Sequence, residues 1–202
     1  MVTKLQINKL QKDFLENSYC VLSNLLSLDF KQYLKLLSKF TLLNNSDIED
    51  NPAINKLGKN PISYYSSPMG DSLLELLTPL YSLISNKNLI PTYSYFRKYF
   101  KDNNLEMHTD RPSCQYSVTL HLDNSNNNTW GLYLDNKKSD NITLLTPNIG
   151  DLVFYKGEDV IHGRDYLKDE WSSHIFLHWV DKNDPNYKEY WYDGREKLGI
   201  PR

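Results

Sequence analysis

The sequence predicts an α+β fold that is mainly β, a double-stranded β-helix (jelly roll) buttressed by N-terminal helices. In the first ninety residues, apolar side chains recur at helical spacing. From about residue 91 onward the spacing changes to two, and short alternating runs are separated by turn residues. Helical runs followed by many short strands indicate an antiparallel sandwich or jelly roll with helices packed against it.

The length of the chain favours one domain. Its 202 residues and 23.7 kDa lie in the size range of a single folding unit. Within a single domain over 1–202, we expect a helical support region over 1–90, a jelly-roll core over 91–181 and a C-terminal tail over 182–202.

Three helices are predicted before the core. Phe30, Leu34 and Leu37 form an apolar stripe with helical spacing. Ser72 and Glu75 have the spacing of a capping box in front of a leucine-rich run. The predicted helices span 4–16, 28–40 (after Ser27) and 72–85, a short strand spans 19–22, and 41–71 is interpreted as irregular loop.

The predicted strands carry an unusual polar face. Ser117, Thr119 and His121 share one side of a strand whose other side is apolar. A polar inward face is unsuited to a packed core, but it suits a barrel that holds a polar ligand. The expected strands span 91–100, 115–122, 130–134, 142–145, 152–155, 160–166 and 174–180.

Composition excludes several classes of protein. A net charge of −2 gives no basic field for nucleic acid, and a hydrophobic content of 40% is that of a globular protein. No apolar run is long enough for a membrane span. Cys20 and Cys114 lie far apart, and the N-terminus lacks a signal-peptide core, so we expect a reducing, cytoplasmic setting.

The candidate chemistry lies between His108 and Arg164. His108 and Asp110 form a His-x-Asp pair, and His162 follows 52 positions after Asp110. Two histidines and one carboxylate form a facial triad that binds Fe(II) and leaves the opposite face open. A second His-x-Asp copy, His121 to Asp123, makes the short motif alone weak evidence.

With these motifs the chain resembles the iron(II)/2-oxoglutarate-dependent dioxygenases, most clearly over residues 92–181. The resemblance implies Fe(II) ligation by His108, Asp110 and His162, with 2-oxoglutarate as cosubstrate and dioxygen as co-reactant. It also implies a cosubstrate contact for Tyr99 and for His121, and it thereby separates the two His-x-Asp copies. The matching stretches are HTDRPSCQYSVTLHLD, GDLVFYKGEDVIHGR, HIFLHWVD and YDGREKLGIP.

One departure from that family concerns the distal carboxylate of 2-oxoglutarate. The family places an Arg or Lys on the strand after the second His, but residues 171–176 contain neither. Arg164 lies two residues after His162 and would face the same side of a strand, about 6.5 Å further along. Arg97, between Tyr95 and Tyr99, is the second candidate for this role.

The reaction implied by the resemblance is hydroxylation of a substrate C–H bond with release of succinate and CO₂. The substrate is read only as a small molecule or a peptide, and the sequence leaves the oligomeric state open. The alternatives are a cupin-like binding module without catalysis and a metalloenzyme that needs no cosubstrate. His174 and His178 share a strand face and are interpreted as packed side chains rather than a second metal pair.

Overall fold

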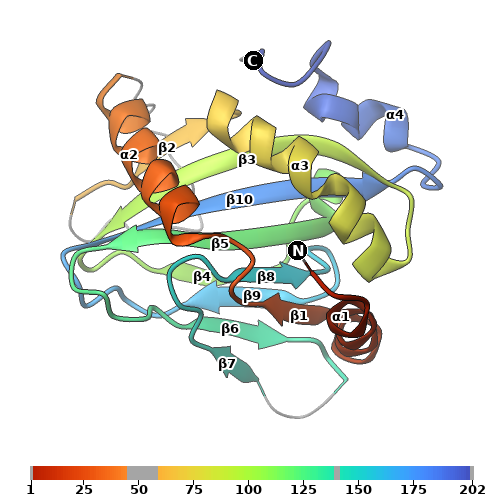
Figure 1. The fold of residues 1–202 in the computed structure, drawn as a ribbon, viewed down its shortest axis with the longest axis horizontal. Helices are drawn as coiled ribbons and strands as arrows, with labels where there is room; N and C mark the ends of the chain where they lie inside the picture. The colour runs from red at the N-terminus through yellow and green to blue at the C-terminus, as the bar shows by residue number, and fades with distance from the viewer. Residues whose placement is uncertain (1, 45–58, 139–141, 201–202) are drawn as a thin grey trace.

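The computed structural model describes residues 2–44, 59–138 and 142–200 (Figure 1). In that part of the chain, antiparallel strands form two facing sheets, as the sequence predicts. The strands are β1 Tyr19–Leu22, β2 Ile62–Tyr65, β3 Leu89–Phe100, β4 Leu105–His108, β5 Tyr116–Asn124, β6 Leu132–Asp135, β7 Thr143–Leu145, β8 Leu152–Tyr155, β9 Ile161–Arg164 and β10 Trp171–Asp181.

The two sheets differ in size. The larger has six strands in the order β1-β8-β5-β10-β3-β2, and the smaller has four in the order β4-β9-β6-β7. Neighbours in these sheets are mostly distant in sequence, so the sheets form the mainly β core of a jelly roll. Register places His108 on β4 opposite His162 on β9, which brings the two predicted imidazole ligands together.

Three helices precede the core: α1 Lys4–Asn17, α2 Leu28–Asn44 and α3 Pro68–Ser85. Thr3 begins α1 with a capping box to Gln6, and the Ser27 hydroxyl accepts a hydrogen bond from the backbone of Phe30 at the start of α2. Helix α3 crosses the larger sheet over β3 and β10 (Figure 1).

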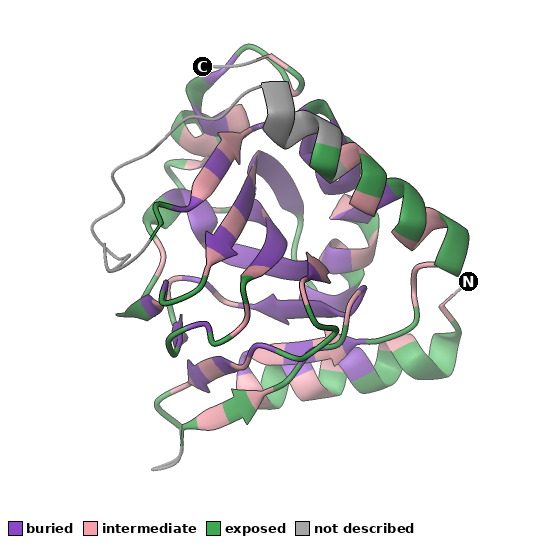
Figure 2. Cartoon of the chain, turned by 90° about the vertical axis from the view of Figure 1, so that its left-hand side faces the viewer, coloured by how far each residue is buried: buried purple, intermediate pink, exposed green. Residues whose placement is uncertain are grey.

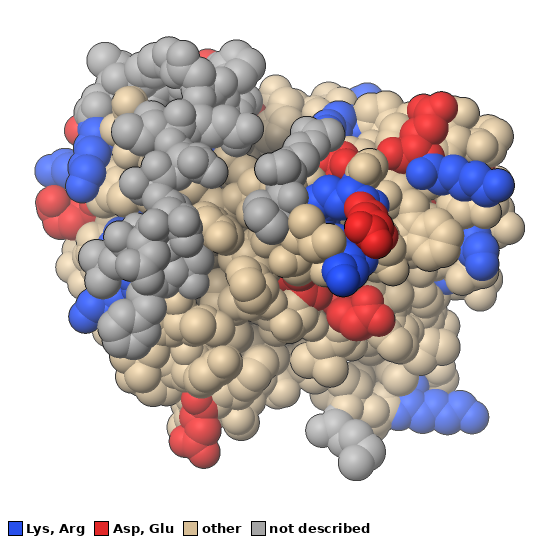
Figure 3. Space-filling view, turned by 90° about the horizontal axis from the view of Figure 1, so that it is seen from above, with Lys and Arg blue, Asp and Glu red and all other residues tan. Residues whose placement is uncertain are grey.

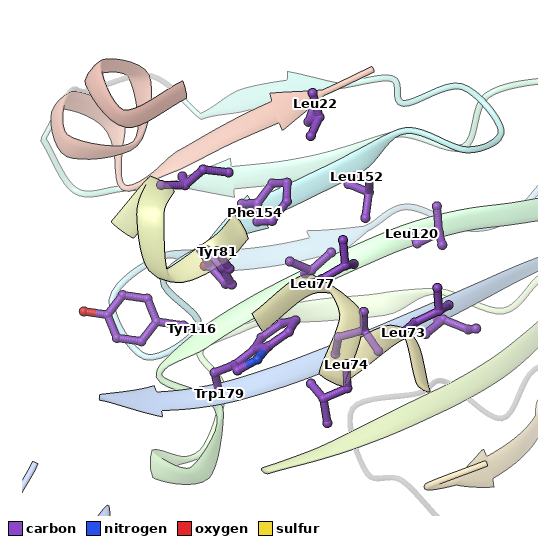
Figure 4. Packing of buried hydrophobic residues seen from close by; sticks show 14 of the residues in the cluster. Leu22, Leu73, Leu74, Leu77, Tyr81, Tyr116, Leu120, Leu152, Phe154 and Trp179 are labelled. Carbon is purple, nitrogen blue, oxygen red and sulfur yellow. The ribbon is translucent and has the colours of Figure 1, made fainter. Parts of the chain in front are cut away.

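The main hydrophobic core lies between the helices and the larger sheet. Trp179 and Tyr81 are fully buried and meet edge to face, with ring centroids 5.2 Å apart. The Trp179 indole also donates to the hydroxyl of Thr78 on α3. Figure 4 shows Leu73, Leu74 and Leu77 of α3 pointing toward the apolar faces of β5, β8 and β10.

The apolar side chains of the larger sheet pack under the helices, so its polar side chains face the smaller sheet. Ser117, Thr119 and His121 on β5 are all buried, as expected for an interior that is polar. Figure 2 shows buried residues concentrated in the strands and exposed residues along the outer sides of the helices.

Two predictions before the core were wrong in part. The expected loop over 41–71 contains the end of α2, strand β2 and the start of α3, while residues 45–58 lie outside the described part. Helix α3 begins after Ser67, whose hydroxyl accepts the Gly70 backbone N–H, with Pro68 at the first helical position. The Ser72 hydroxyl instead bonds to a carbonyl within the helix.

The tail contains more structure than its composition indicated. It forms α4 Tyr187–Tyr190 and the 3₁₀ segment Trp191–Gly194. Arg195 then forms a buried ion pair with Asp71 of α3, with 3.1 Å between Nη1 and Oδ2, so the tail is anchored to the helical layer.

One face of the molecule carries side chains of both charges. On the face drawn in Figure 3, Lys and Arg side chains of the described residues lie beside Asp and Glu side chains. Among the described residues, no helix has both the length and the apolar character needed to cross a membrane.

Candidate metal centre and active site

The three predicted ligands lie together at one end of the paired strands β4 and β9. His108 ends β4, Asp110 follows it, and His162 lies on β9. One ligand atom from each residue can be chosen so that all lie within 4.8 Å of one another. Among the described residues this is the one group of three or more such side chains that could hold a metal ion.

Backbone carbonyls fix both imidazoles. Nδ1 of His108 lies 2.8 Å from the carbonyl oxygen of Glu106, and Nδ1 of His162 lies 2.9 Å from that of Val160. Because a carbonyl oxygen only accepts, each Nδ1 carries the proton and each Nε2 keeps a free lone pair. Those Nε2 atoms lie 3.7 and 3.5 Å from Oδ1 of Asp110. Histidines that bind metals are commonly held in this way, with the other ring nitrogen bonded to a carbonyl.

Asp110 is oriented by a serine and by close backbone packing. The Ser117 hydroxyl lies 2.8 Å from Oδ2 of Asp110, which leaves Oδ1 toward the imidazoles. The Asp110 backbone N–H donates to the carbonyl of Gly157. A Cβ on Gly157 would lie 2.4 Å from Oδ2 of Asp110 and 2.2 Å from the carbonyl oxygen of Cys114, so this approach requires glycine.

The protonation states suit a cation. Burial, followed by the charge of His162, lowers the pKa of His108. Burial raises the pKa of Asp110, but the neighbouring imidazoles of His162 and His178 and the hydrogen bond from the Ser117 hydroxyl together hold that pKa well below its usual value. At neutral pH the centre therefore presents a carboxylate beside a neutral His108 imidazole.

A cavity of about 330 Å³ opens from the triad. Its walls are mostly tyrosine and histidine, and Asp110 is its one carboxylate among the described lining residues. The lining residues are Tyr65, Tyr93, Tyr95, Arg97, Tyr99, Leu105, His108, Asp110, Arg111, Cys114, Tyr155, His162, Phe176 and His178.

Arg164 is buried on β9, two residues after His162, but it is not among the residues that line the cavity at the triad. It is 3% exposed, and Nη1 donates to the carbonyl oxygens of Trp130 and Gly131 at 2.6 and 3.3 Å. Its Nε and Nη2 are buried and have no hydrogen-bond partner within residues 2–44, 59–138 and 142–200. Burial lowers the pKa of Arg164 to about 10, and among the described residues no carboxylate pairs with it.

His121 and Tyr99 lie in the same interior region. The His121 ring stacks on that of His174, with centroids 4.8 Å apart, and Nδ1 of His121 lies 3.3 Å from the carbonyl of Pro147. Burial lowers the pKa of His121 to about 4 and holds the pKa of His174 well below its usual value, so both rings are neutral. Tyr99 is fully buried and lines the cavity, whereas His121 is not among the residues that line it.

Arg97 and Arg111 lie on the cavity wall. Arg97 is 4% exposed, and its Nε and Nη2 bond to the hydroxyls of Ser63 and Tyr95 at 3.0 and 2.9 Å. Arg111 pairs with Asp193 of the tail, with 2.9 Å between Nη2 and Oδ2.

The second His-x-Asp copy lies elsewhere. Asp123 is paired with Lys35 at 2.8 Å, on the side of the larger sheet that faces α2. Asp123 therefore lies outside the group formed by His108, Asp110 and His162.

Sequence reasoning missed the residues that orient Asp110. Ser117 was noted only as part of a polar strand face, and Gly157 was not singled out. His178, expected to be a packed side chain, lies 2.9 Å through its Nδ1 from the Ser117 hydroxyl. The sequence signal that could have identified Ser117 was the polar face of β5, because the Ser117 side chain on that face points toward the triad.

Solved structures share this fold at low sequence identity. A 2-oxoglutarate–Fe(II) oxygenase family oxidoreductase from Burkholderia pseudomallei matches with a TM-score of 0.69 and 11% identity over 89% of this chain and 93% of the other. A Pseudomonas putida prolyl-4-hydroxylase gives 0.70 and 12% over 88% and 100%. The epimerase SnoN, in complex with Fe³⁺, α-ketoglutarate and nogalamycin RO, gives 0.67 and 12% over 89% and 85%.

No family model and no curated protein matches the sequence. The structural matches define the class of fold: the chain has the jelly roll of the 2-oxoglutarate–Fe(II) oxygenases. Within that fold, this chain brings together a His108–Asp110–His162 group.

Proposed function

We propose that this protein is a non-haem Fe(II)- and 2-oxoglutarate-dependent dioxygenase that hydroxylates a C–H bond of its substrate. The observation that carries the proposal is the buried guanidinium of Arg164, on the strand that bears His162, with no carboxylate partner in the described part of the chain. A buried charge without a counter-ion is costly in a protein interior, and the distal carboxylate of a bound 2-oxoglutarate would offset that cost.

The donor set suits Fe(II). Two imidazole Nε2 lone pairs and one carboxylate oxygen converge at the cavity wall, and this N,N,O set with open positions is typical of non-haem iron oxygenases. When bound, iron with 2-oxoglutarate and dioxygen supplies oxidative decarboxylation to succinate and CO₂ coupled to oxidation of a C–H bond. The protein's part is to position the reactants and to exclude water.

The residues of this chain would divide that task. Ser117 and the Glu106 and Val160 carbonyls hold the ligand atoms in place. Nε and Nη2 of Arg164 are available for a bidentate bond to the distal carboxylate of 2-oxoglutarate. Two strand residues separate His162 and Arg164 by about 6.5 Å, similar to the length of 2-oxoglutarate.

Substitution of each ligand tests the metal assignment. We expect His108→Ala, Asp110→Ala and His162→Ala each to weaken Fe(II) binding at least a hundredfold, measured by anaerobic equilibrium dialysis. His174→Ala is the matched control, because it also removes a buried neutral imidazole from the barrel. Equal loss of iron in the control, or full iron binding without His108, would refute the assignment.

A further inference from the structure

A second arginine is held in the cavity, on a wall of tyrosines. Tyr65, Tyr93, Tyr95, Arg97 and Tyr99 all line it, and we call this surface the tyrosine–arginine wall. Four of the five alternate along one face of β3. The Tyr65 and Tyr93 rings stack, with centroids 5.1 Å apart, which stiffens the part of the wall contributed by β2.

Arg97 is fixed in orientation without an ion pair. Its Nε and Nη2 bond to the neutral hydroxyls of Ser63 and Tyr95, and its guanidinium carbon lies 4.7 Å above the Tyr95 ring and 5.6 Å from that of Tyr99. Among the described residues no carboxylate pairs with Arg97. A charge that is 4% exposed and unpaired is costly unless a ligand supplies the counter-charge.

The other cation of the cavity is already neutralised. Arg111 is paired with Asp193, and the same carboxylate accepts a hydrogen bond from the Tyr65 hydroxyl at 2.5 Å. Arg97 also lines the same cavity as His108, Asp110 and His162. A group bound to Arg97 would therefore lie in the same cavity as the triad.

Charge balance distinguishes the two buried arginines. A divalent iron, the Asp110 carboxylate, the two carboxylates of 2-oxoglutarate and the Arg164 guanidinium sum to zero net charge. Arg97 then remains as one uncompensated positive charge in the cavity. One planar guanidinium matches one planar carboxylate, whereas a phosphate dianion would require a second free cation.

We propose, building on the oxygenase function above, that Arg97 binds a carboxylate of the primary substrate, which is a small monocarboxylic acid. The cavity of about 330 Å³ admits a compact molecule, and the tyrosine rings supply its apolar and hydrogen-bonding contacts. Anchoring the carboxylate on the tyrosine–arginine wall holds a nearby C–H bond toward the open side of the triad.

Matched acids and amides test the charge requirement. Benzoate, phenylacetate and hexanoate are each compared with the corresponding primary amide, which has nearly the same shape but no charge. Binding is measured by thermal shift on the anaerobic protein, with Fe(II) and 2-oxoglutarate and without them. We expect at least one acid to bind at least tenfold more tightly than its amide. No acid–amide difference in any pair, including no binding by any acid, overturns the proposal.

Variants then assign the charge to Arg97. Arg97→Met should weaken binding of the acid about ten- to hundredfold and leave binding of the corresponding amide unchanged. Arg97→Lys should retain part of the preference for the acid. Arg111→Met is the matched control and should keep the full preference. The 2-oxoglutarate dissociation constant should change less than about threefold in Arg97→Met, a small effect on the tenfold-per-1.4 kcal/mol scale.

The outcomes separate this proposal from the oxygenase function. If Arg97→Met weakens 2-oxoglutarate binding as strongly as Arg164→Met does, Arg97 is a cosubstrate ligand and the substrate assignment is overturned. If iron and 2-oxoglutarate fail to bind while the protein alone still prefers acids through Arg97, the oxygenase function fails and the carboxylate site stands. If Arg97→Met does not fold, the wild-type acid–amide comparison together with Arg97→Lys decides.

Discussion

Replacing Arg164 with methionine should abolish tight binding of 2-oxoglutarate while sparing iron. Methionine keeps much of the side-chain volume that packs near Trp130, where the guanidinium carbon now lies 5.0 Å from the ring centroid. It removes the two guanidinium nitrogens that have no hydrogen-bond partner among the residues that the structure describes. The change therefore isolates the charge from the packing.

The structure sets the size of the effect. Breaking a buried ion pair by removing one partner costs about 3–5 kcal/mol, because the other charge stays buried. Since each 1.4 kcal/mol is about tenfold, the dissociation constant of 2-oxoglutarate should rise by about two orders of magnitude or more. At a 2-oxoglutarate concentration a hundred times the wild-type constant, stabilisation by the ligand should fall from about 2.7 to about 0.4 kcal/mol.

The assay is thermal or urea unfolding of the anaerobic, iron-loaded protein with and without 2-oxoglutarate, together with iron binding by dialysis. Arg97→Met is the control, since it removes the other carboxylate-free arginine of the interior. An unchanged 2-oxoglutarate constant in Arg164→Met would refute the assignment of Arg164 to the distal carboxylate. Loss of iron in the same variant would show that its effect is not specific to the cosubstrate.

Three further outcomes are expected. Asp123→Asn should leave iron binding intact in dialysis, because Asp123 pairs with Lys35 outside the metal centre; a loss as large as for Asp110→Asn would refute this. Ser117→Ala should weaken iron binding about 10–100-fold, because Asp110 would lose the hydrogen bond that orients it. An unchanged iron affinity would show that Ser117 does not orient Asp110. His121 has a folded pKa of about 4 against about 6.5 unfolded, so the unfolded state binds more protons between these values. The free energy of unfolding should fall as pH falls from about 6.5 to 4, by up to about 1.4 kcal/mol per pH unit for this residue, and an equal slope in His121→Gln would contradict the cause.

The elements with clear periodicity were predictable from sequence. The period of two over residues 91–100 predicted β3, and the same alternation placed Tyr95, Arg97 and Tyr99 on one face, where all three line the cavity. Strand β4 is four residues long and largely open to solvent. Its sequence, LEMH, alternates apolar and polar residues over only four positions, which is too short a run to reveal a strand, although it carries His108.

Other features depend on distant partners and so escaped the sequence. Helix α3 begins at Pro68, because the Ser67 hydroxyl accepts the Gly70 backbone N–H. In the sequence, the capping-box pattern at Ser72 indicated a later start for the same helix. The ion pair between Arg195 and Asp71 joins residues 124 positions apart. No local sequence pattern predicts such a contact, because it forms only when the tail packs against the helical layer.

The metal ligands were predictable from the spacing of a motif, and the direction of Arg164 was predictable from strand geometry. His108, Asp110 and His162 follow a spacing with a chemical rationale, and the pairing of β4 with β9 brings them together. The inward direction of Arg164 followed from strand geometry. That its Nε and Nη2 lack partners required the packing of the whole barrel, since any of the chain's acidic residues was a possible partner.

The most direct test of the account is the anaerobic visible spectrum of the protein with Fe(II), before and after addition of 2-oxoglutarate, followed by admission of oxygen and assay of succinate. The account predicts a weak charge-transfer band that appears only when both iron and 2-oxoglutarate are present, and succinate formation once oxygen is admitted. The band and the succinate should both be lost in His162→Ala and greatly weakened in Arg164→Met at the same 2-oxoglutarate concentration. Iron binding by the wild-type protein with neither a band nor succinate would contradict the central claim.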